Sequence, residues 1–300
     1  MQAASDCDIE LFVLGAGQDA GAPQIGNHAD PAWNDTDKIL LPTALGVVDH
    51  SSKQRFLFEA TPAIGAQLKL LETLISKPLD AQSLDGIFLT HAHIGHYAGL
   101  MYLGREAAGV SDIPVYALPR MIAFLSDQGP WSQLVDIGNV ILHTLQPDTA
   151  LQLTKHLSVT ALPVPHRDEY SETAGFVIAT PQSRTLFIPD IDSWELWQAA
   201  SDRDIGDMLR DVDFAFVDAT FYDDNELPGR DMREIPHPRV TATMARLDAL
   251  TPDEKSRLHF IHYNHTNPIR FSDSDASAAV AKRGFRIARR GDRFCLLSGD

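Results

Sequence analysis

The pattern of apolar and polar positions predicts a chain that alternates short strands with helices. Apolar, β-branched and aromatic residues form short runs bounded by glycine, proline or polar residues, which is typical of buried strands. The predicted strands are 9–17, 43–50, 55–61, 86–93, 139–145, 157–166, 175–181, 184–190, 213–221, 257–265 and 286–297.

Apolar residues at helical spacing occur between these strands. In the segment 62–75, Pro62 stands at the first turn, and four apolar residues recur at helical spacing, namely Ile64, Leu68, Leu71 and Ile75. Further helices are predicted at 96–109, 194–210, 239–250 and 273–283. The pattern therefore predicts an α/β protein in which two packed sheets carry helices on their outer faces.

The polar segments between these elements do not divide the chain. Residues 21–38 are polar and irregular and are interpreted as a long loop. Residues 14–23, LGAGQDAGAP, lack the spacing of a phosphate-binding loop and are interpreted as a turn after the first strand. Because no linker rich in proline, glycine or serine appears, we expect one domain over residues 1–300.

Composition and charge narrow the classes of partner. The 300 residues are 44% hydrophobic and 22% charged, which is close to an average folded protein. The net charge of −16 argues against nucleic-acid binding, because phosphate neutralisation needs a basic surface. A C-terminal basic cluster is interpreted as solvated strand edges: Arg286, Arg289, Arg290 and Arg293. No apolar run of about 18 residues is present, so we expect no membrane span.

The two cysteines and the N-terminal segment leave the compartment open. Cys7 and Cys295 stand near opposite ends of the chain and are either one disulfide or two reduced thiols. Residues 1–8 lack the charged and apolar regions of a signal peptide. We therefore expect a cytoplasmic protein or, if a leader has been removed, a periplasmic one.

The segment THAHIGH, residues 90–96, places three histidines at the end of a predicted strand. His91 and His93 are two residues apart, so their side chains point the same way in extended backbone. Gly95 allows a turn that brings His96 to the same place from the start of the next helix. Neutral imidazole is a common metal ligand, and zinc binds it readily. The alternative interpretation is a helix start with three surface histidines.

Other predicted strands also end in residues that bind metals or protons. These residues are His166, Asp190, Asp192, Asp218, His262 and His265. Each of them alone would more often be a cap, a turn or a buried hydrogen bond. Together they favour a site, because α/β proteins assemble sites from the ends of separate strands.

These motifs resemble those of the metallo-β-lactamase fold superfamily. That family has a strand followed by HxHxDH and a helix, then a lone histidine, an aspartate and a final histidine. THAHIGH, VPH, IPD and IHYNH match this order over nearly the whole chain. The resemblance implies an αββα four-layer sandwich, with two mixed sheets and helices outside.

Within the superfamily, the chain is most similar to the group that contains the pyrroloquinoline-quinone biosynthesis protein B. The matching segments are LGAGQDAGAPQ, FLFEATPAI, THAHIGHYAGL, FVDATFYDDNELPGRDM and HYNHTNP. That group usually has a cysteine-rich metal knot after the PQ dipeptide, and this chain has no cysteine there. The group also often lacks the first two histidines of the pattern, which this chain keeps.

The resemblance implies two metal positions that share one aspartate. The expected ligands are His91, His93 and His166 for the first ion, His96 and His262 for the second, and Asp190 between them. Gly95 stands where the family has the aspartate of HxHxDH, so we expect one firm site and a second that is weak or absent. Asp192, Asp218 or His265 could restore the second site. The expected cofactor is a divalent metal, first of all zinc, with iron and manganese as alternatives.

The expected activity is that of a metallohydrolase. A metal-bound hydroxide would attack an ester-type or phosphodiester-type bond in a small-molecule substrate. Asp190 would orient the water, and His265 or His96 would protonate the leaving group. The candidate substrate-binding residues are Tyr97, Arg230 and His237. For Arg230, the alternative is a salt bridge to Asp231 or Glu226.

Two other functions remain open from the sequence. The first is an iron- and oxygen-dependent redox enzyme on the same fold, because histidine and carboxylate ligands suit iron as well as zinc. The second is a non-catalytic metal-binding protein, since Gly95 removes a family ligand. A nuclease is less favoured because of the negative charge. The oligomeric state and the substrate are left open.

Overall fold

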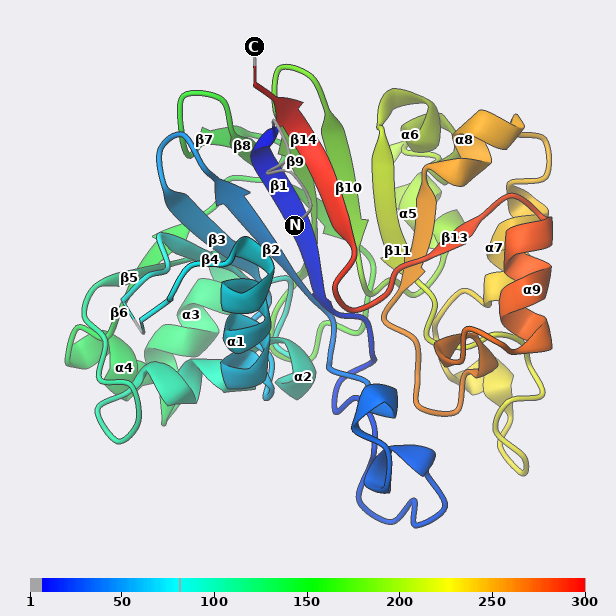
Figure 1. Cartoon of the computed structure of the whole chain (residues 1–300), viewed down its shortest axis with the longest axis horizontal. Coiled ribbons are helices and arrows are strands. Elements are labelled where there is room, and N and C mark those ends of the chain that lie inside the picture. The colour runs from blue at the N-terminus through cyan, green and yellow to red at the C-terminus, as the bar shows by residue number, and fades with distance from the viewer. Residues whose placement is uncertain (1–6, 81, 300) are drawn as a thin grey trace.

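Two β-sheets of seven strands each form the centre of the protein (Figure 1). The computed structural model describes residues 7–80 and 82–299. Residues 1–6, part of the segment inspected for a signal peptide, lie outside the described residues. The first sheet contains, in spatial order, β14 (Arg293–Ser298), β1 (Cys7–Gly15), β2 (Ala44–Asp49), β3 (Gln54–Phe58), β4 (Gly86–Phe88), β5 (Ile113–Ala117) and β6 (Val140–Thr144).

The second sheet has the same mixed character as the first. It contains, in spatial order, β13 (Arg286–Ile287), β12 (Leu258–Ile261), β11 (Phe214–Asp218), β10 (Arg184–Ile188), β9 (Thr173–Ala179), β8 (Ser158–Val164) and β7 (Ala150–Gln152). Strands β3 to β6 are parallel in the first sheet, and strands β10 to β13 are parallel in the second. The remaining pairs are antiparallel, which confirms two mixed sheets.

Alternating side chains on β1 show why the sheets pack between two helical layers. Leu11 and Val13 enter the core shared with the second sheet, whereas Phe12 and Leu14 enter a separate core under the helices. This alternation follows from the two-residue period of extended backbone, and both faces of the strand are buried. The predicted αββα sandwich is therefore confirmed.

The helices lie on the outer faces of the two sheets (Figure 1). Outside the first sheet are α1 (Ile64–Ile75), α2 (Ile94–Tyr97), α3 (Pro119–Asp127) and α4 (Trp131–Asp136). Outside the second are α5 (Trp194–Ser201), α6 (Ile205–Asp211), α7 (Val240–Arg246), α8 (Pro252–Ser256) and α9 (Asp275–Lys282). Short 3-10 turns are η1 (Pro31–Trp33), η2 (Thr36–Lys38), η3 (Ala98–Leu103), η4 (Met232–Glu234) and η5 (Pro268–Arg270).

Several predicted elements were wrong in extent. The helix predicted over 96–109 is only α2 followed by η3. The helix predicted over 194–210 is interrupted at Asp202, which has a φ of 58°, and Asp204 then caps α6. The sequence analysis also missed β5, α3 and α4, which lie between residues 113 and 136.

The apolar run 286–297 was predicted as one strand, but it forms β13 and β14 in different sheets. The chain turns between them, where Asp292 accepts a hydrogen bond from the Arg289 N–H and Gly291 has a φ of 95°. The Gly291 N–H then donates to Val13 in the first sheet. This crossing carries the C-terminus to the N-terminal strand.

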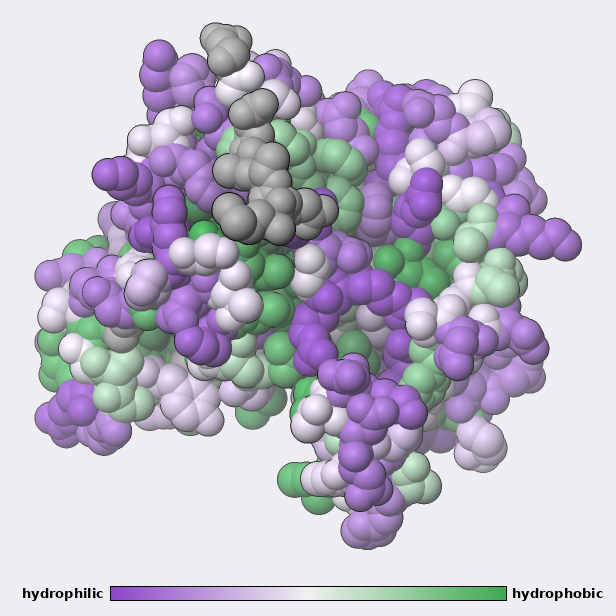
Figure 2. All heavy atoms as spheres, viewed as in Figure 1, coloured by the Kyte–Doolittle hydropathy of each residue, from purple (hydrophilic) through white to green (hydrophobic). Residues whose placement is uncertain are grey.

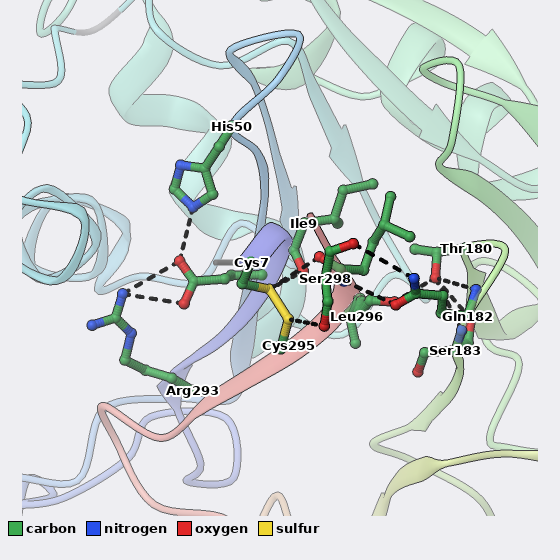
Figure 3. Close-up of a disulfide and its surroundings, with 12 residues drawn as sticks. Cys7, Ile9, His50, Thr180, Gln182, Ser183, Arg293, Cys295, Leu296 and Ser298 are labelled. Atoms are coloured by element: carbon green, nitrogen blue, oxygen red, sulfur yellow. Dashed lines mark hydrogen bonds and ion pairs between the residues drawn. A yellow bond between two sulfur atoms is a disulfide. The ribbon is translucent and has the colours of Figure 1, made fainter. Parts of the chain in front are cut away.

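The C-terminal strand β14 is joined to β1 by a disulfide. Cys7 and Cys295 are bonded, which decides between the two alternatives left open by the sequence (Figure 3).

Hydrophilic residues cover most of the face in Figure 2. Among the described residues, no helix has both the length and the apolar character needed to span a bilayer.

Strand direction places the ends of several strands at one edge of the sandwich. In the first sheet β1, β3 and β4 run the same way, because β2 is antiparallel to both β1 and β3, and β4 is parallel to β3. In the second sheet β10, β11 and β12 are parallel. The residues that follow these strands carry the candidate ligands.

Candidate metal centre

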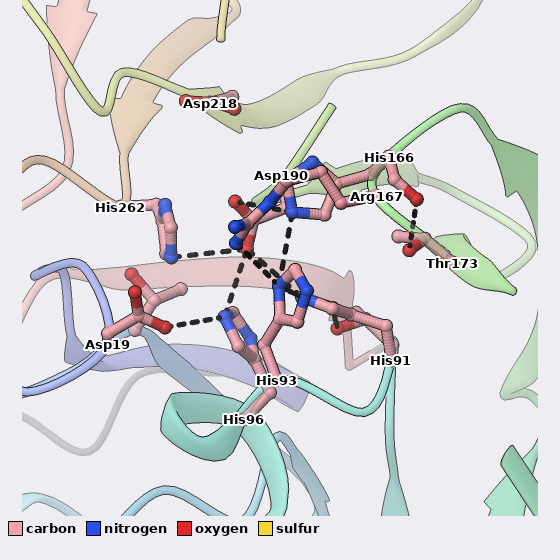
Figure 4. A network of polar contacts seen from close by, with 12 residues as sticks. Asp19, His91, His93, His96, His166, Arg167, Thr173, Asp190, Asp218 and His262 are labelled. Carbon is pink, nitrogen blue, oxygen red and sulfur yellow. Dashed lines mark hydrogen bonds and ion pairs between the residues drawn. The ribbon is translucent and has the colours of Figure 1, made fainter. Parts of the chain in front are cut away.

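All six predicted metal ligands meet between the two sheets (Figure 4). They come from segments that follow four different strands: His91, His93 and His96 after β4, His166 after β8, Asp190 after β10 and His262 after β12. Their ligand atoms form overlapping groups of three in which all atoms lie within 4.8 Å of one another. The residues that follow these strands therefore lie together, as the strand-end rule expects, and their role as metal ligands stays a prediction.

The first group consists of His91, His93 and His166. The Nδ1 atom of His93 lies 2.7 Å from His91 Nε2 and 3.2 Å from His166 Nε2. Burial lowers the pKa of His91 well below its ordinary value of 6.5, and burial also lowers that of His93, although Glu169 opposes this shift. Neutral imidazoles with converging nitrogens are the form that binds a metal.

Asp190 lies between this group and a second one. Its Oδ2 atom is 2.9 Å from His96 Nε2 and 3.2 Å from His262 Nε2, and its Oδ1 atom is 3.7 Å from His166 Nε2. Burial raises the pKa of Asp190, but the surrounding histidines outweigh burial and hold it well below 3.8. The carboxylate is therefore ionised and lies between the two groups of histidines.

Three buried atoms at this junction have no hydrogen-bond partner among the described residues. They are His96 Nε2, Asp190 Oδ2 and His262 Nε2, which face one another at ion-pair distance but without the alignment of a hydrogen bond. Unpartnered polar atoms are costly inside a protein, because their hydration is lost without replacement. A divalent ion would satisfy all three, so the residues present fit a metal ion.

Oxygen atoms behind the histidines fix the direction of the rings. Glu59 Oε1 lies 3.1 Å from His96 Nδ1, Asp192 Oδ1 lies 3.0 Å from His166 Nδ1, and Thr220 Oγ1 lies 3.1 Å from His262 Nδ1. These contacts leave the Nε2 atoms pointing toward the centre, as is usual for metal-binding histidines. The sequence analysis did not single out Glu59, although it also follows an apolar strand.

Glu59 also sets the charge around His96. Burial lowers the pKa of His96, but Glu59 and Asp190 outweigh burial and raise the pKa well above 6.5. Glu59 is fully buried and also accepts a 2.6 Å hydrogen bond from the Thr90 hydroxyl. The negative potential of the two carboxylates favours a cation at this position.

One further carboxylate was missed from the sequence. Asp19, in the turn that follows β1, forms a group with His96 and His262, and its Oδ1 atom lies 3.7 Å from His96 Nε2 (Figure 4). The only signal for it in the sequence is a polar residue shortly after an apolar strand.

The residues expected to restore the second position lie elsewhere. Asp192 contacts His166, and Asp218 lies 2.7 Å from His237 Nδ1. His265, also predicted to donate a proton, contacts Asn27 in the long loop and belongs to none of the described ligand groups. Its catalytic role stays a prediction.

The three predicted substrate-binding residues have different surroundings. His237 forms a group with His166 and Asp190, so it belongs to the centre. Tyr97 is buried against the rings of Phe124 and Trp131 in the outer helical layer. Their roles in binding substrate stay predictions.

Arg230 is exposed in the loop after β11. Neither of the alternative salt bridges considered for it is formed in the described part of the chain. Asp231 pairs with Arg233, and Glu226 accepts a hydrogen bond from Thr266. Its role in substrate binding also stays a prediction.

Comparison with known proteins finds relatives that match nearly the whole chain. The chain is 26% identical to the coenzyme PQQ synthesis protein B of Rhizobium meliloti (strain 1021), covering 95% of this chain and 97% of that protein. It is 25% identical to the protein of the same name from Xanthomonas campestris pv. campestris (strain B100), covering 94% and 98%.

Solved structures show the same architecture. The crystal structure of Zn(2+)-bound PqqB from Methylobacterium extorquens has a TM-score of 0.76 at 21% identity, covering 95% of this chain and 99% of that one. A diphosphatase from the PhnP family has a TM-score of 0.62 at 20% identity, covering 95% and 96%.

A family model described as the beta-lactamase superfamily domain matches residues 54–263. The match spans β3 to the residue after His262, so it contains all six predicted metal ligands. The chain belongs to the beta-lactamase superfamily, with the metallo-β-lactamase fold, and within it is a PqqB-like protein.

Proposed function

We propose that this protein is a zinc-dependent hydrolase that acts on ester-type or phosphodiester-type bonds of small molecules. The observation that carries the proposal is the convergence of buried His96, Asp190 and His262 atoms that form no well-aligned hydrogen bond, beside three converging histidine nitrogens. His91, His93 and His166 would hold one ion, and Asp190 would contact it from the second group. The zinc-bound relative of the same fold supports the choice of metal.

A bound zinc ion supplies a Lewis acid and lowers the pKa of a water ligand toward neutrality. The chain itself positions the reacting groups. Asp190 is ionised, and its two oxygens face different histidines, so it can orient a water molecule at the centre. His237 Nδ1 lies 3.7 Å from Asp190 Oδ1 and 2.7 Å from Asp218 Oδ2, so the two carboxylates hold this ring beside the centre.

Arg167 is the basic side chain best placed to bind an anionic substrate. Its Nη2 atom lies 3.4 Å from His93 Nδ1, and its side chain is half exposed. The side chain of His93 is 18% exposed, whereas that of His91 is 1% exposed, so solvent reaches the centre on the His93 side. A guanidinium at this entrance would orient a carboxylate or phosphate group.

The test is metal analysis combined with hydrolysis of chromogenic esters and phosphodiesters. The protein would be purified without added metal and compared with His91→Ala and with His143→Ala, which removes an exposed histidine on β6. We expect bound zinc and measurable turnover in the wild type and in His143→Ala. In His91→Ala, kcat should fall by about 100-fold or more, because loss of even an outer-shell partner costs about 10- to 100-fold. Absence of metal after incubation with zinc would refute the proposal.

The full-length similarity to coenzyme PQQ synthesis proteins B favours a second candidate. In this case the centre would bind iron and serve an oxygen-dependent step in the synthesis of a quinone cofactor. Histidine and carboxylate ligands suit iron as well as zinc. Bound iron together with oxygen consumption in the presence of a quinone precursor would place this candidate first.

A further inference from the structure

Asp19 occupies the space that a side chain at position 95 would need. A Cβ atom added to Gly95 would lie 2.3 Å from Asp19 Cα and 2.6 Å from Asp19 Oδ1. Such contacts are far below van der Waals distance, and the first involves backbone that cannot simply rotate away. The turn that carries Asp19 can therefore approach α2 this closely only because residue 95 is glycine.

The turn is held in this place by backbone hydrogen bonds. The Gly21 N–H donates to Gln18 O at 2.7 Å and closes the turn around Asp19, whose φ is 40°. Aspartate tolerates such turn conformations better than most residues. The Gln18 N–H also donates to Tyr263 O, and the Tyr263 N–H donates to Ala16 O, both at 3.0 Å. Asp19 is thus tied to the residue that follows His262.

The spacing of the facing atoms suits one shared ion. Two ligands that each lie about 2.0–2.2 Å from a tetrahedral zinc are roughly 3–4 Å apart. Asp19 Oδ1 is 3.7 Å from His96 Nε2, and Asp190 Oδ2 is 3.2 Å from His262 Nε2. The Nε2 atoms of His96 and His262 are buried and face Asp190 Oδ2, but neither forms a well-aligned hydrogen bond in the described part of the chain.

We propose that Asp19 supplies the carboxylate ligand of the second metal position, in place of the aspartate that Gly95 lacks. The second position is then formed by His96, His262 and Asp19, with Asp190 shared between the ions. This inference rests on the proposed metal centre and changes its expected content from one firm ion to two. It also gives the close approach of Gly95 and Asp19 a function. Gly95 leaves the space that the Asp19 turn occupies, and Asp19 supplies the carboxylate that Gly95 lacks.

The experiment is a calorimetric titration of the metal-free full chain with Zn²⁺, which reports stoichiometry and affinity without relying on activity. The variants are Asp19→Asn and Gly95→Ala, with Asp37→Asn as the matched control, since it removes an exposed carboxylate from the neighbouring long loop. We expect two zinc ions in the wild type and in Asp37→Asn. In Asp19→Asn, the second ion should bind about 10- to 100-fold more weakly. Gly95→Ala should weaken the same ion, because the added methyl group displaces the turn.

Thermal melts of the metal-free proteins would verify that each variant is folded. One zinc ion in both the wild type and Asp19→Asn would overturn this inference and leave the proposed hydrolase intact. Two ions bound equally by both proteins would also overturn it. No zinc in the wild type would refute the proposed function itself.

Discussion

The two ends of strand β1 belong to regions of opposite character. At its start, Cys7 is bonded to Cys295 of β14, and at its other end the chain enters the turn that carries Asp19. Near the disulfide, polar side chains are paired: Glu10 contacts Arg293 and His50, and Gln182 accepts a hydrogen bond from the Ser298 N–H (Figure 3). That region joins β1 to β14 through the disulfide, and it joins β14 to the second sheet through Gln182.

The ligand-bearing end is built differently. Asp19, Glu59 and His262 all have positive φ values, of 40°, 76° and 64°. Each non-glycine residue in such a conformation costs about 1–3 kcal/mol. Buried histidine and carboxylate atoms converge beside them (Figure 4). The comparison teaches that the disulfide end cross-links strands and pairs its polar groups, whereas the ligand-bearing end gathers charged groups and backbone conformations that cost stability.

The largest expected effect comes from removing the charge shared by the two metal positions. Asp190→Asn keeps the side-chain volume, so the fold should persist, but both ions lose a ligand. We expect zinc affinity to fall by more than about 100-fold at both positions, because loss of an outer-shell partner alone costs about 10- to 100-fold. Titration with zinc would measure this effect, with Asp136→Asn on α4 as an exposed control. Unchanged stoichiometry and affinity would show that Asp190 is not shared.

A smaller effect, on stability alone, is expected at the opposite end of β1. Replacing both Cys7 and Cys295 by serine removes a cross-link that closes a loop of 288 residues. We expect the free energy of unfolding to fall by about 2–4 kcal/mol, which is typical of disulfides. Urea denaturation would measure the loss. Zinc binding should stay as in the wild type, and a lost metal in the folded variant would show that the two ends are coupled.

The smallest expected effect is a pH-dependent loss of stability in the long loop at the ligand-bearing end. Arg270 donates two hydrogen bonds to buried Asp30, at 2.8 and 3.1 Å, and this pairing lowers the pKa of Asp30 from 3.8 although burial opposes it. The Asp30 carboxylate therefore contributes its full stabilisation of the folded protein above pH ~4. This contribution is lost as the pH falls through the lowered pKa of Asp30 in the folded state.

The variant Asp30→Asn tests this pH dependence. At pH 7 it should cost about 1.5–3 kcal/mol, the range for hydrogen bonds to charged groups. The difference from the wild type should shrink below pH 4, because the wild-type carboxyl then becomes neutral as well. Thermal melts at a series of pH values would measure it. A difference that does not change with pH would mean that packing, rather than charge, holds the loop.

Local sequence patterns predicted the part of the candidate centre that comes from one continuous segment. THAHIGH is one continuous segment, so the spacing of His91 and His93 in extended backbone was enough to predict a metal site. His166, Asp190 and His262 were predictable because each follows an apolar strand. The pattern also matched a family whose members share this order of motifs.

The hydrophobic pattern gave wrong bounds for strands and helices that end where they meet segments distant in the sequence. The run 286–297 looks continuous, yet β13 pairs with β12 and β14 pairs with β1, so two different sheets divide it. The predicted helix after His96 is short, because backbone bonds to the Ala60 region hold this segment: the Ala60 N–H donates to His96 O, and the Gly99 N–H donates to Ala60 O. These partners lie more than thirty residues away in the chain.

The sequence by itself determined the layered fold, the family and six candidate ligands at strand ends, since periodicity and motif order are local properties of the chain. Only the tertiary structure decided that Asp19 faces His96, that Glu59 orients His96, and that Cys7 pairs with Cys295. Each of these contacts joins segments that become neighbours through strand pairing. The sequence shows that Gly95 replaces the aspartate of the family pattern. The carboxylate that occupies the space beside Gly95 comes from a turn 76 residues earlier, and its position depends on the packing of the first sheet.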